Sequence, residues 1–234
     1  MSVDIDMKAL LESGAHFGHK TSRWHPKMAP YIHSRRQGAH IINLEKTVDA
    51  LDEALPKLTD IAKKGGKILF VGTKKSVREP VKTAAEAVEM PYVVNRWVGG
   101  TLTNVETVNK QIKKMKDLER RMETGELENR YSKLEVQRFQ EEIDLLNTRY
   151  GGIKDMEKQP SALIIVDAVE DKNAIKEANS LKIPVFALTD TNVDPSAIDY
   201  VIPCNDDSVK ATTLMLDYFV EAIKAGKKSA TKEK

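Results

Sequence analysis

The sequence predicts an α/β protein built on a doubly wound parallel sheet. Five short segments are apolar at both odd and even positions and rich in β-branched residues. This pattern is typical of parallel strands buried on both faces of a sheet. Helical patterns separate most of these segments, as in the alternating order of doubly wound proteins. We therefore expect strands at "KILFVG" (67–72), "YVVN" (92–95), "ALIIVD" (162–167), "PVFALTD" (184–190) and "YVIP" (200–203).

The helices are predicted from three-four apolar spacing and from signals at their ends. A first helix over about residues 45–64 ends at Gly65-Gly66. A second helix, over residues 76–90, begins with Ser76 and Glu79 at the spacing of a capping box. Two more helices are predicted over residues 171–181 and 206–225, and Gly226 is expected to end the last one.

Residues 104–150 follow a different pattern, in which a narrow apolar seam of three-four spacing runs through mixed charges. Two such runs are separated by "ETGELENRYS", which predicts two long helices folded back on each other as an inserted antiparallel coiled-coil helical hairpin. The predicted organisation is a discontinuous α/β domain with a basic N-terminal arm, a hairpin and a tail. The boundaries are 1–103 with 151–225 for the domain, 104–150 for the hairpin and 226–234 for a Lys-rich flexible tail.

The composition is that of a globular protein, with 234 residues of which 41% are hydrophobic and 31% charged. No apolar run approaches the roughly 20 residues needed to cross a bilayer, and the acids near the start do not fit a secretory signal. We expect a cytoplasmic protein with no membrane partner. Cys204 is the single cysteine, so an internal disulfide is excluded, and we assign it no role.

The formal net charge of +2 hides a gradient along the chain. Residues 1–104 carry a net charge of +5, residues 151–223 carry −7, and residues 224–234 carry +4. Residues 13–44 contain no acid and hold all five histidines. Because an acid-free basic window suits a polyanion, we expect one basic face and one acidic face.

The carboxyl ends of the strands are where doubly wound proteins bind their ligands. Thr73, Asp167 and Asp190 fall there and could serve an enzyme or a small-ligand binder. However, "VGTKKSVRE" lacks the spacing of a phosphate-binding loop, no dinucleotide-binding glycine pattern occurs, and neither aspartate is accompanied by a recognisable nucleophile. We predict no catalytic residue and no cofactor, because turns and caps explain the aspartates more simply.

His16 and His19 form a His-x-x-His pair that could share a metal with an acid such as Asp206 or Asp207. Five histidines clustered among basic residues are explained more simply by hydrogen bonds to backbone or phosphate. We therefore predict no metal site, and whether a metal binds near the two histidines stays open.

Both tryptophans follow an arginine, as Arg23-Trp24 and as Arg96-Trp97 in "NRWVGGTLTN". Such an arginine can fork onto phosphate oxygens while the neighbouring ring stacks on a base or packs beneath the loop. Because Trp97 follows a buried strand, we expect it in the core with its N–H bonded internally. The two glycines permit a tight turn, and Asn104 or Thr103 is expected to cap the following helix.

Seven segments spread over residues 13–208 resemble, in the same order, those of a known family. They are "SGAHFGHKTSRWHPKMAPYI", "HIINLEKT", "ILFVGTKK", "NRWVGGTLTN", "GGIKDM", "IPVFALTDTNVDP" and "DYVIPCNDDS". On these motifs the chain resembles the bacterial small-subunit ribosomal protein S2 family. The resemblance implies a flavodoxin-like α/β domain with a protruding coiled-coil hairpin and no catalytic role.

The resemblance further implies a structural constituent of the small ribosomal subunit that binds small-subunit rRNA, supports translation and assembles late. It would contact neighbouring small-subunit ribosomal proteins and help to dock the mRNA-binding ribosomal protein S1. Phosphate contacts should dominate its affinity for rRNA. The residues expected to face rRNA are His16, His19, Lys20, Arg23, Trp24, Lys27, Arg35, Arg36, Lys74, Lys75, Arg96, Gly99, Gly100, Thr101 and Asn104.

Two other classes of function stay open on the residues alone. The first is a freestanding flavodoxin-like small-ligand-binding protein or enzyme that uses the edge of the sheet near Thr73, Asp167 and Asp190. The second is a protein-docking module formed by the hairpin and the acidic C-terminal half, with RNA contact incidental. A ligand-shift melting screen would detect the first, and co-sedimentation with nuclease-treated ribosomal subunits would detect the second.

Overall fold

The protein is described by a computed structural model that covers residues 3–156 and 158–232. Its centre is a five-stranded sheet in the order β5-β4-β6-β7-β8, in which all neighbours are parallel. This order is that of flavodoxin-like doubly wound sheets, so the predicted α/β class is confirmed. The strands are β4 (Ile68–Val71), β5 (Tyr92–Val93), β6 (Ala162–Ile165), β7 (Val185–Thr189) and β8 (Tyr200–Pro203).

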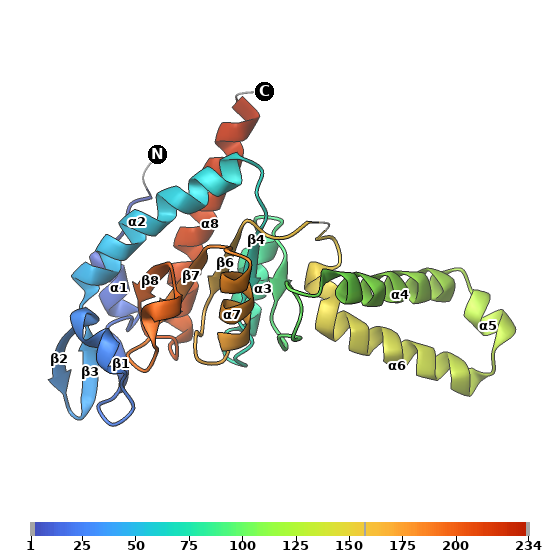
Figure 1. Cartoon of the computed structure of the whole chain (residues 1–234), viewed down its shortest axis with the longest axis horizontal. Coiled ribbons are helices and arrows are strands. Elements are labelled where there is room, and N and C mark those ends of the chain that lie inside the picture. Colours follow the sequence, from blue (N-terminus) through green and yellow to red (C-terminus); the bar gives the residue numbers. More distant parts are fainter. Residues whose placement is uncertain (1–2, 157, 233–234) are drawn as a thin grey trace.

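Both faces of this sheet are buried, which explains why the strands are apolar on both alternations. On β4, Ile68 and Phe70 belong to one layer of the core, whereas Leu69 and Val71 belong to the other. Figure 1 shows the helices that cover the sheet. The first layer holds α2 (Leu44–Lys63), α3 (Arg78–Glu86) and α8 (Val209–Lys232), and the second holds α7 (Lys172–Ser180) with the base of the hairpin.

The helical hairpin projects from the sheet between β5 and β6 (Figure 1). It consists of α4 (Val105–Glu123), a short α5 (Glu126–Arg130) at the tip, and α6 (Lys133–Tyr150). The base of the hairpin is anchored, because its apolar side chains join the second core layer. The two long helices lie where they were predicted, while coiled-coil packing between them stays a prediction.

The basic N-terminal arm folds into a small sheet that the apolar pattern did not predict. After a short helix α1 (Met7–Glu12), its strands pair antiparallel in the order β1-β3-β2. Gln37 and Gly38 both have positive φ and form a two-residue turn between β2 and β3, as type I′ hairpins require. The elements are β1 (Phe17–Lys20), the 3-10 turn η1 (Pro26–Tyr31), β2 (Ile32–Arg36) and β3 (Ala39–Ile42).

The helix that follows β4 is shorter than predicted. It begins at Arg78, behind Val77, and no side-chain cap forms, so the capping box expected at Ser76 is wrong. The amide of Val77 instead donates to the carbonyl of Lys74 (3.0 Å), which turns the chain before the helix starts. The predicted end at Met90 is also wrong, because Glu89 adopts a positive φ of 51° after the helix has ended.

The last helix, α8, continues past Gly226 to Lys232, so the predicted helix end at Gly226 is wrong, while the flexibility of the Lys-rich tail from residue 226 stays a prediction. Residues 233–234 of that tail lie outside the described residues. Gly226 is buried where α8 packs against α2, and a Cβ there would lie 2.3 Å from the carbonyl oxygen of Thr59. The glycine therefore serves close helix packing. Across residues 3–156 and 158–232, no helix is both long and apolar enough to span a bilayer.

We expect Gly226→Ala to lower the free energy of unfolding by about 1 kcal/mol. Helix propensity alone favours the substitution by about 1 kcal/mol, but the new methyl group would overlap the backbone of α2, and overpacking of this kind costs about 1–3 kcal/mol. Urea unfolding followed by circular dichroism measures the change. Ser229→Ala in the same helix is the control, and a stabilised Gly226→Ala variant would contradict the close approach of α8 to α2.

Candidate functional site

The N-terminal sheet lies against the carboxyl edge of the large sheet, where doubly wound proteins bind ligands. The amide of His19 donates to Asp190 Oδ1 (3.1 Å) and to Thr191 Oγ1 (3.0 Å), and the amide of His25 donates to the carbonyl of Thr191 (2.7 Å). Gly18 comes so close that a Cβ would lie 2.7 Å from Thr191 Cγ2. The arm of the chain itself therefore closes the edge beyond β7.

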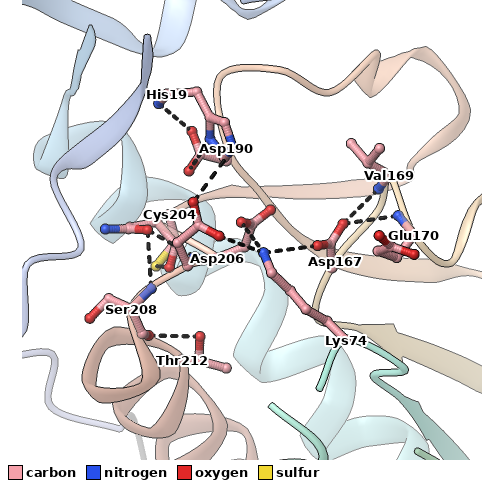
Figure 2. Close-up of polar contacts among 12 residues, drawn as sticks. His19, Lys74, Asp167, Val169, Glu170, Asp190, Cys204, Asp206, Ser208 and Thr212 are labelled. Atoms are coloured by element: carbon pink, nitrogen blue, oxygen red, sulfur yellow. Dashed lines mark hydrogen bonds and ion pairs between the residues drawn. The ribbon is translucent and has the colours of Figure 1, made fainter. Parts of the chain in front are cut away.

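Lys74, from the loop after β4, extends its ammonium group toward Asp167 and Asp206 (Figure 2) and also contacts Asp207. Its Nζ lies 3.1 Å from Asp167, 3.0 Å from Asp206 and 2.7 Å from Asp207. The ion pairs join the loops that follow β4, β6 and β8. Lys74 was predicted to face rRNA, and this geometry favours a structural use for it.

The charges of this cluster depend on burial and on one another. Burial, and after it the neighbouring carboxylates of Asp167 and Asp190, raise the pKa of Asp206 to about 7 against the opposing effect of Lys74. Burial alone would lower the pKa of Lys74, but Asp207 and Asp206 outweigh it and raise the value. The hydrogen bond with Asp190 raises the pKa of His19. Lys74 is therefore held charged, whereas Asp206 titrates near neutral pH.

Ligand atoms of His19, Asp206 and Asp207 lie within 4.8 Å of one another, which is the one arrangement in the described part of the chain that could hold a metal ion. An imidazole with two carboxylates is a donor set that divalent ions such as zinc accept. His16 does not belong to it, because its ring packs beside Phe17 at 4.0 Å. A metal here would compete with the ammonium of Lys74, which already contacts both carboxylates.

Four cations of the arm are exposed together on the small sheet. Lys20 of β1 and Arg36 of β2 pair with the same residue of β3, Ala39. The amide of Arg23 donates to the carbonyl of Lys20 (2.9 Å), which brings a third cation to that strand. Arg35 adjoins them on β2, and all four side chains are exposed. The fold thus gathers four of the predicted rRNA-facing residues.

Trp24 is half-buried beside two charged or polar side chains of the small sheet. The guanidinium carbon of Arg35 lies 5.8 Å from the centre of its ring, and the ring of His40 lies 5.1 Å away. The aromatic face can hold Arg35 in place by cation–π attraction. Lys27 is engaged elsewhere, because its Nζ lies 3.1 Å from a carboxylate oxygen of Asp194.

The loop "NRWVGGTLTN" is organised around an internal anion, the carboxylate of Glu177 on α7. Oε1 of Glu177 accepts hydrogen bonds from Trp97 Nε1 (2.9 Å) and from the amide of Gly100 (2.8 Å). Oε2 accepts from the amides of Leu102 (2.9 Å) and Thr103 (3.2 Å). Burial opposes ionisation, but these bonds outweigh it and lower the pKa of Glu177. Donors that could have held a phosphate therefore hold a side chain of the protein itself.

The other residues predicted in and near this loop differ in exposure. Lys75 and Arg96 are exposed after β4 and β5, and Gly99 is exposed as well. Thr101 is buried, and its hydroxyl donates to a backbone carbonyl within the loop. Asn104 caps α4, as predicted. The fold therefore leaves two cations of this region open to a ligand, while the threonine is structural.

A second internal carboxylate lies where the strand order reverses, between β4 and β6. Asp171 accepts hydrogen bonds from the amide (3.1 Å) and the hydroxyl (2.8 Å) of Thr73. Burial raises the pKa of Asp171 to about 6, although these bonds oppose the rise. Thr73, the candidate for ligand contact in the enzyme hypothesis, is thus already bonded.

Glu177 and Asp171 are the functional neighbours that sequence reasoning missed. Neither stands in a motif, and each acts on a loop far away in the sequence. One signal was available, since "NRWVGGTLTN" offers several backbone donors and contains no acid. Such a loop needs an anion from elsewhere in the chain or from a ligand.

The fold and this edge define the class of the protein: an α/β scaffold in which the ligand-binding edge of a doubly wound sheet is closed by the chain's own N-terminal arm and internal ion pairs. The chain matches the family model "Ribosomal protein S2" over residues 10–226. It is 47% identical over 226 residues to "Small ribosomal subunit protein uS2" of Fusobacterium nucleatum subsp. nucleatum, covering 97% of this chain and 91% of that relative.

The chain therefore belongs to the ribosomal protein S2 family. This membership makes it a bacterial ribosomal protein of the small subunit, with its place in translation and on the cytoplasmic ribosome.

Proposed function

We propose that the chain is a structural constituent that binds small-subunit rRNA through the exposed cations of its N-terminal sheet and assembles late. The observation that carries this proposal is the clustering of Lys20, Arg23, Arg35 and Arg36 on one small sheet. Residues 13–44 supply no acid to neutralise them. Arginine side chains bind phosphate oxygens in pairs, and phosphate contacts fix the register of a protein on nucleic acid.

We expect the combined change Arg23→Gln, Arg35→Gln and Arg36→Gln to weaken binding to a small-subunit rRNA transcript about 100-fold near physiological salt. Three lost phosphate contacts should also make the dependence of log K on log salt shallower by about 2. Fluorescence anisotropy of labelled rRNA across a salt series measures both quantities.

The matched control removes the same charge from the hairpin, as Lys110→Gln, Lys114→Gln and Arg120→Gln. These exposed cations form ion pairs with Glu106, Glu142 and Asp117, so their loss should cost little stability. Equal effects of the two triple variants would mean that only net charge matters, and would reject the N-terminal sheet as the rRNA anchor.

The docking of ribosomal protein S1 and contacts with neighbouring small-subunit proteins are proposed along with rRNA binding. They rest on the family resemblance and on the charge of −7 over residues 151–223, which offers an acidic surface distinct from the basic arm. Small subunits reconstituted with and without the chain should differ in how much S1 sediments with them. Equal amounts of S1 in both would reject the docking role.

The alternative of a small-ligand-binding protein or enzyme has less support. The carboxyl edge is covered by the arm, and Lys74 and Thr73 are bonded to carboxylates of the chain. A melting-temperature screen with nucleotides and phosphates tests this alternative, which would gain support from a saturable shift with any of them.

A further inference from the structure

A basic cleft lies between α3 and the base of the hairpin, away from the N-terminal sheet. Its volume is about 500 Å³, and its walls come from α3, the end of β5 and residues 147–154 at the end of α6 and the turn η2 (Gly151–Ile153). The cations that line it are Arg78, Lys82, Arg149 and Lys154. We propose that this cleft binds phosphates of the rRNA backbone as a second anchor, an inference that rests on the proposed rRNA binding.

The cations of the cleft are not held in ion pairs with carboxylates of the described residues. In the part of the chain that the structure describes, no ion pair involves Lys82, Arg149 or Lys154, whereas cations on the nearby hairpin are paired. Arg78 is bonded to carbonyls alone, through Nε to Thr73 (3.0 Å) and through Nη2 to Asn95 (3.2 Å). Carbonyls fix the guanidinium without cancelling its charge.

Two acids reduce this charge only in part. Glu79 and Glu86 also line the cleft, which leaves four cations against two carboxylates. Glu86 already accepts a hydrogen bond from the hydroxyl of Tyr92 (3.1 Å). A concave site with an excess of positive charge raises the local concentration of anions.

The lining favours RNA over an acidic protein. Protein interfaces are depleted of charge at their centre and enriched in apolar and aromatic anchors. This cleft is lined by six charged side chains and by Asn95, Asn147 and Thr148, while its apolar and aromatic lining is limited to Tyr92, Val93 and Val94 near the end of β5. A fixed guanidinium beside long lysine and arginine side chains matches phosphate oxygens spaced along a backbone.

The test measures rRNA binding of the full chain carrying Lys82→Gln, Arg149→Gln and Lys154→Gln, with Arg78 left in place because it holds the loops. We expect affinity for the rRNA transcript to fall about tenfold and the salt dependence of log K to become shallower by about 2, with an unchanged melting temperature. The hairpin variant Lys110→Gln, Lys114→Gln and Arg120→Gln, which has the same change in net charge, should bind like wild type.

The outcomes separate this inference from the proposed function. If the cleft variant binds like the hairpin control while the variant of Arg23, Arg35 and Arg36 loses affinity, the cleft is not an anchor and the proposed function stands. If wild type does not bind the transcript, the proposed function itself fails.

A second measurement identifies the occupant directly. A photoreactive amino acid in place of the exposed Thr148 should crosslink to rRNA in assembled small subunits. Crosslinks to protein alone would show an acidic protein partner and overturn the inference.

Discussion

Replacing Lys74 by methionine should lower the free energy of unfolding by about 4 kcal/mol above neutral pH. Methionine keeps the unbranched apolar stem, one atom shorter, but removes the charge that faces Asp167, Asp206 and Asp207. Removing one partner of a buried ion pair costs about 3–5 kcal/mol, because the remaining charge is left without compensation. Asp167 and Asp206 are almost fully buried, so solvent cannot replace the ammonium. Denaturant unfolding followed by tryptophan fluorescence measures the loss.

The loss should grow as the pH rises. Folded Asp206 has a pKa of about 7 against an ordinary value of 3.8, so the folded state binds more protons than the unfolded state between these values. The free energy of unfolding therefore falls as the pH rises through this window. In the variant, Lys74 no longer lowers the pKa of Asp206, so the gap to the unfolded value is wider and the free energy of unfolding falls further. The difference between variant and wild type should be smallest near about pH 5 and largest near about pH 8.

Lys75→Met is the matched control, since Lys75 is the exposed neighbour of Lys74. Its effect should stay within about 0.5 kcal/mol. Adding Asp206→Asn to Lys74→Met removes one of the uncompensated charges and should restore part of the stability, as expected for residues in contact. Equal stability of the two single variants would show that the ion pairs do not hold the loops together.

The elements that could be predicted from the sequence are those whose burial leaves a local pattern. The five strands are buried on both faces, so each shows as an apolar run of its own. The hairpin shows as three-four spacing because only one stripe of each long helix is covered. The exposure of Arg23, Arg35, Arg36 and Arg96 could be anticipated for the same reason, since nothing apolar demands that they be buried.

The parts that could not be predicted depend on contacts between distant segments. Four of the five residues of β2 are exposed. The small sheet is fixed by hydrogen bonds from His19 to Asp190 and Thr191, both more than 170 residues away in the sequence. Gly226 has the sequence signature of a helix end, and its use in packing appears only when α2 lies beside it. The cleft at Arg149 combines residues from α3 and α6 whose charges look ordinary in sequence.

Glu177→Gln should lower the free energy of unfolding by about 3 kcal/mol at neutral pH and release the loop "NRWVGGTLTN". Gln keeps one acceptor oxygen, but its NH₂ group would face donors that now reach the second carboxylate oxygen, such as the amides of Leu102 and Thr103. Hydrogen bonds to a charged group contribute about 1.5–3 kcal/mol each, and a buried donor left unpaired adds its own cost. Hydrogen exchange at the amides of Gly100, Leu102 and Thr103 should accelerate together.

The pH dependence separates the lost charge from a general loss of packing. The pKa of folded Glu177 lies below its ordinary value, so its contribution to stability is present at neutral pH and is lost as the pH falls through the folded pKa. The free energy of unfolding of Glu177→Gln should therefore differ most from that of wild type near neutral pH and converge with it in acid. Asp206 has the opposite pH dependence, because its pKa is raised in the folded state. Glu170→Gln, at an exposed position ahead of α7, should leave both stability and loop exchange unchanged. If the loop amides exchange at wild-type rates in Glu177→Gln, the carboxylate does not organise the loop. The burial of Trp97 would then be what positions the neighbouring Arg96.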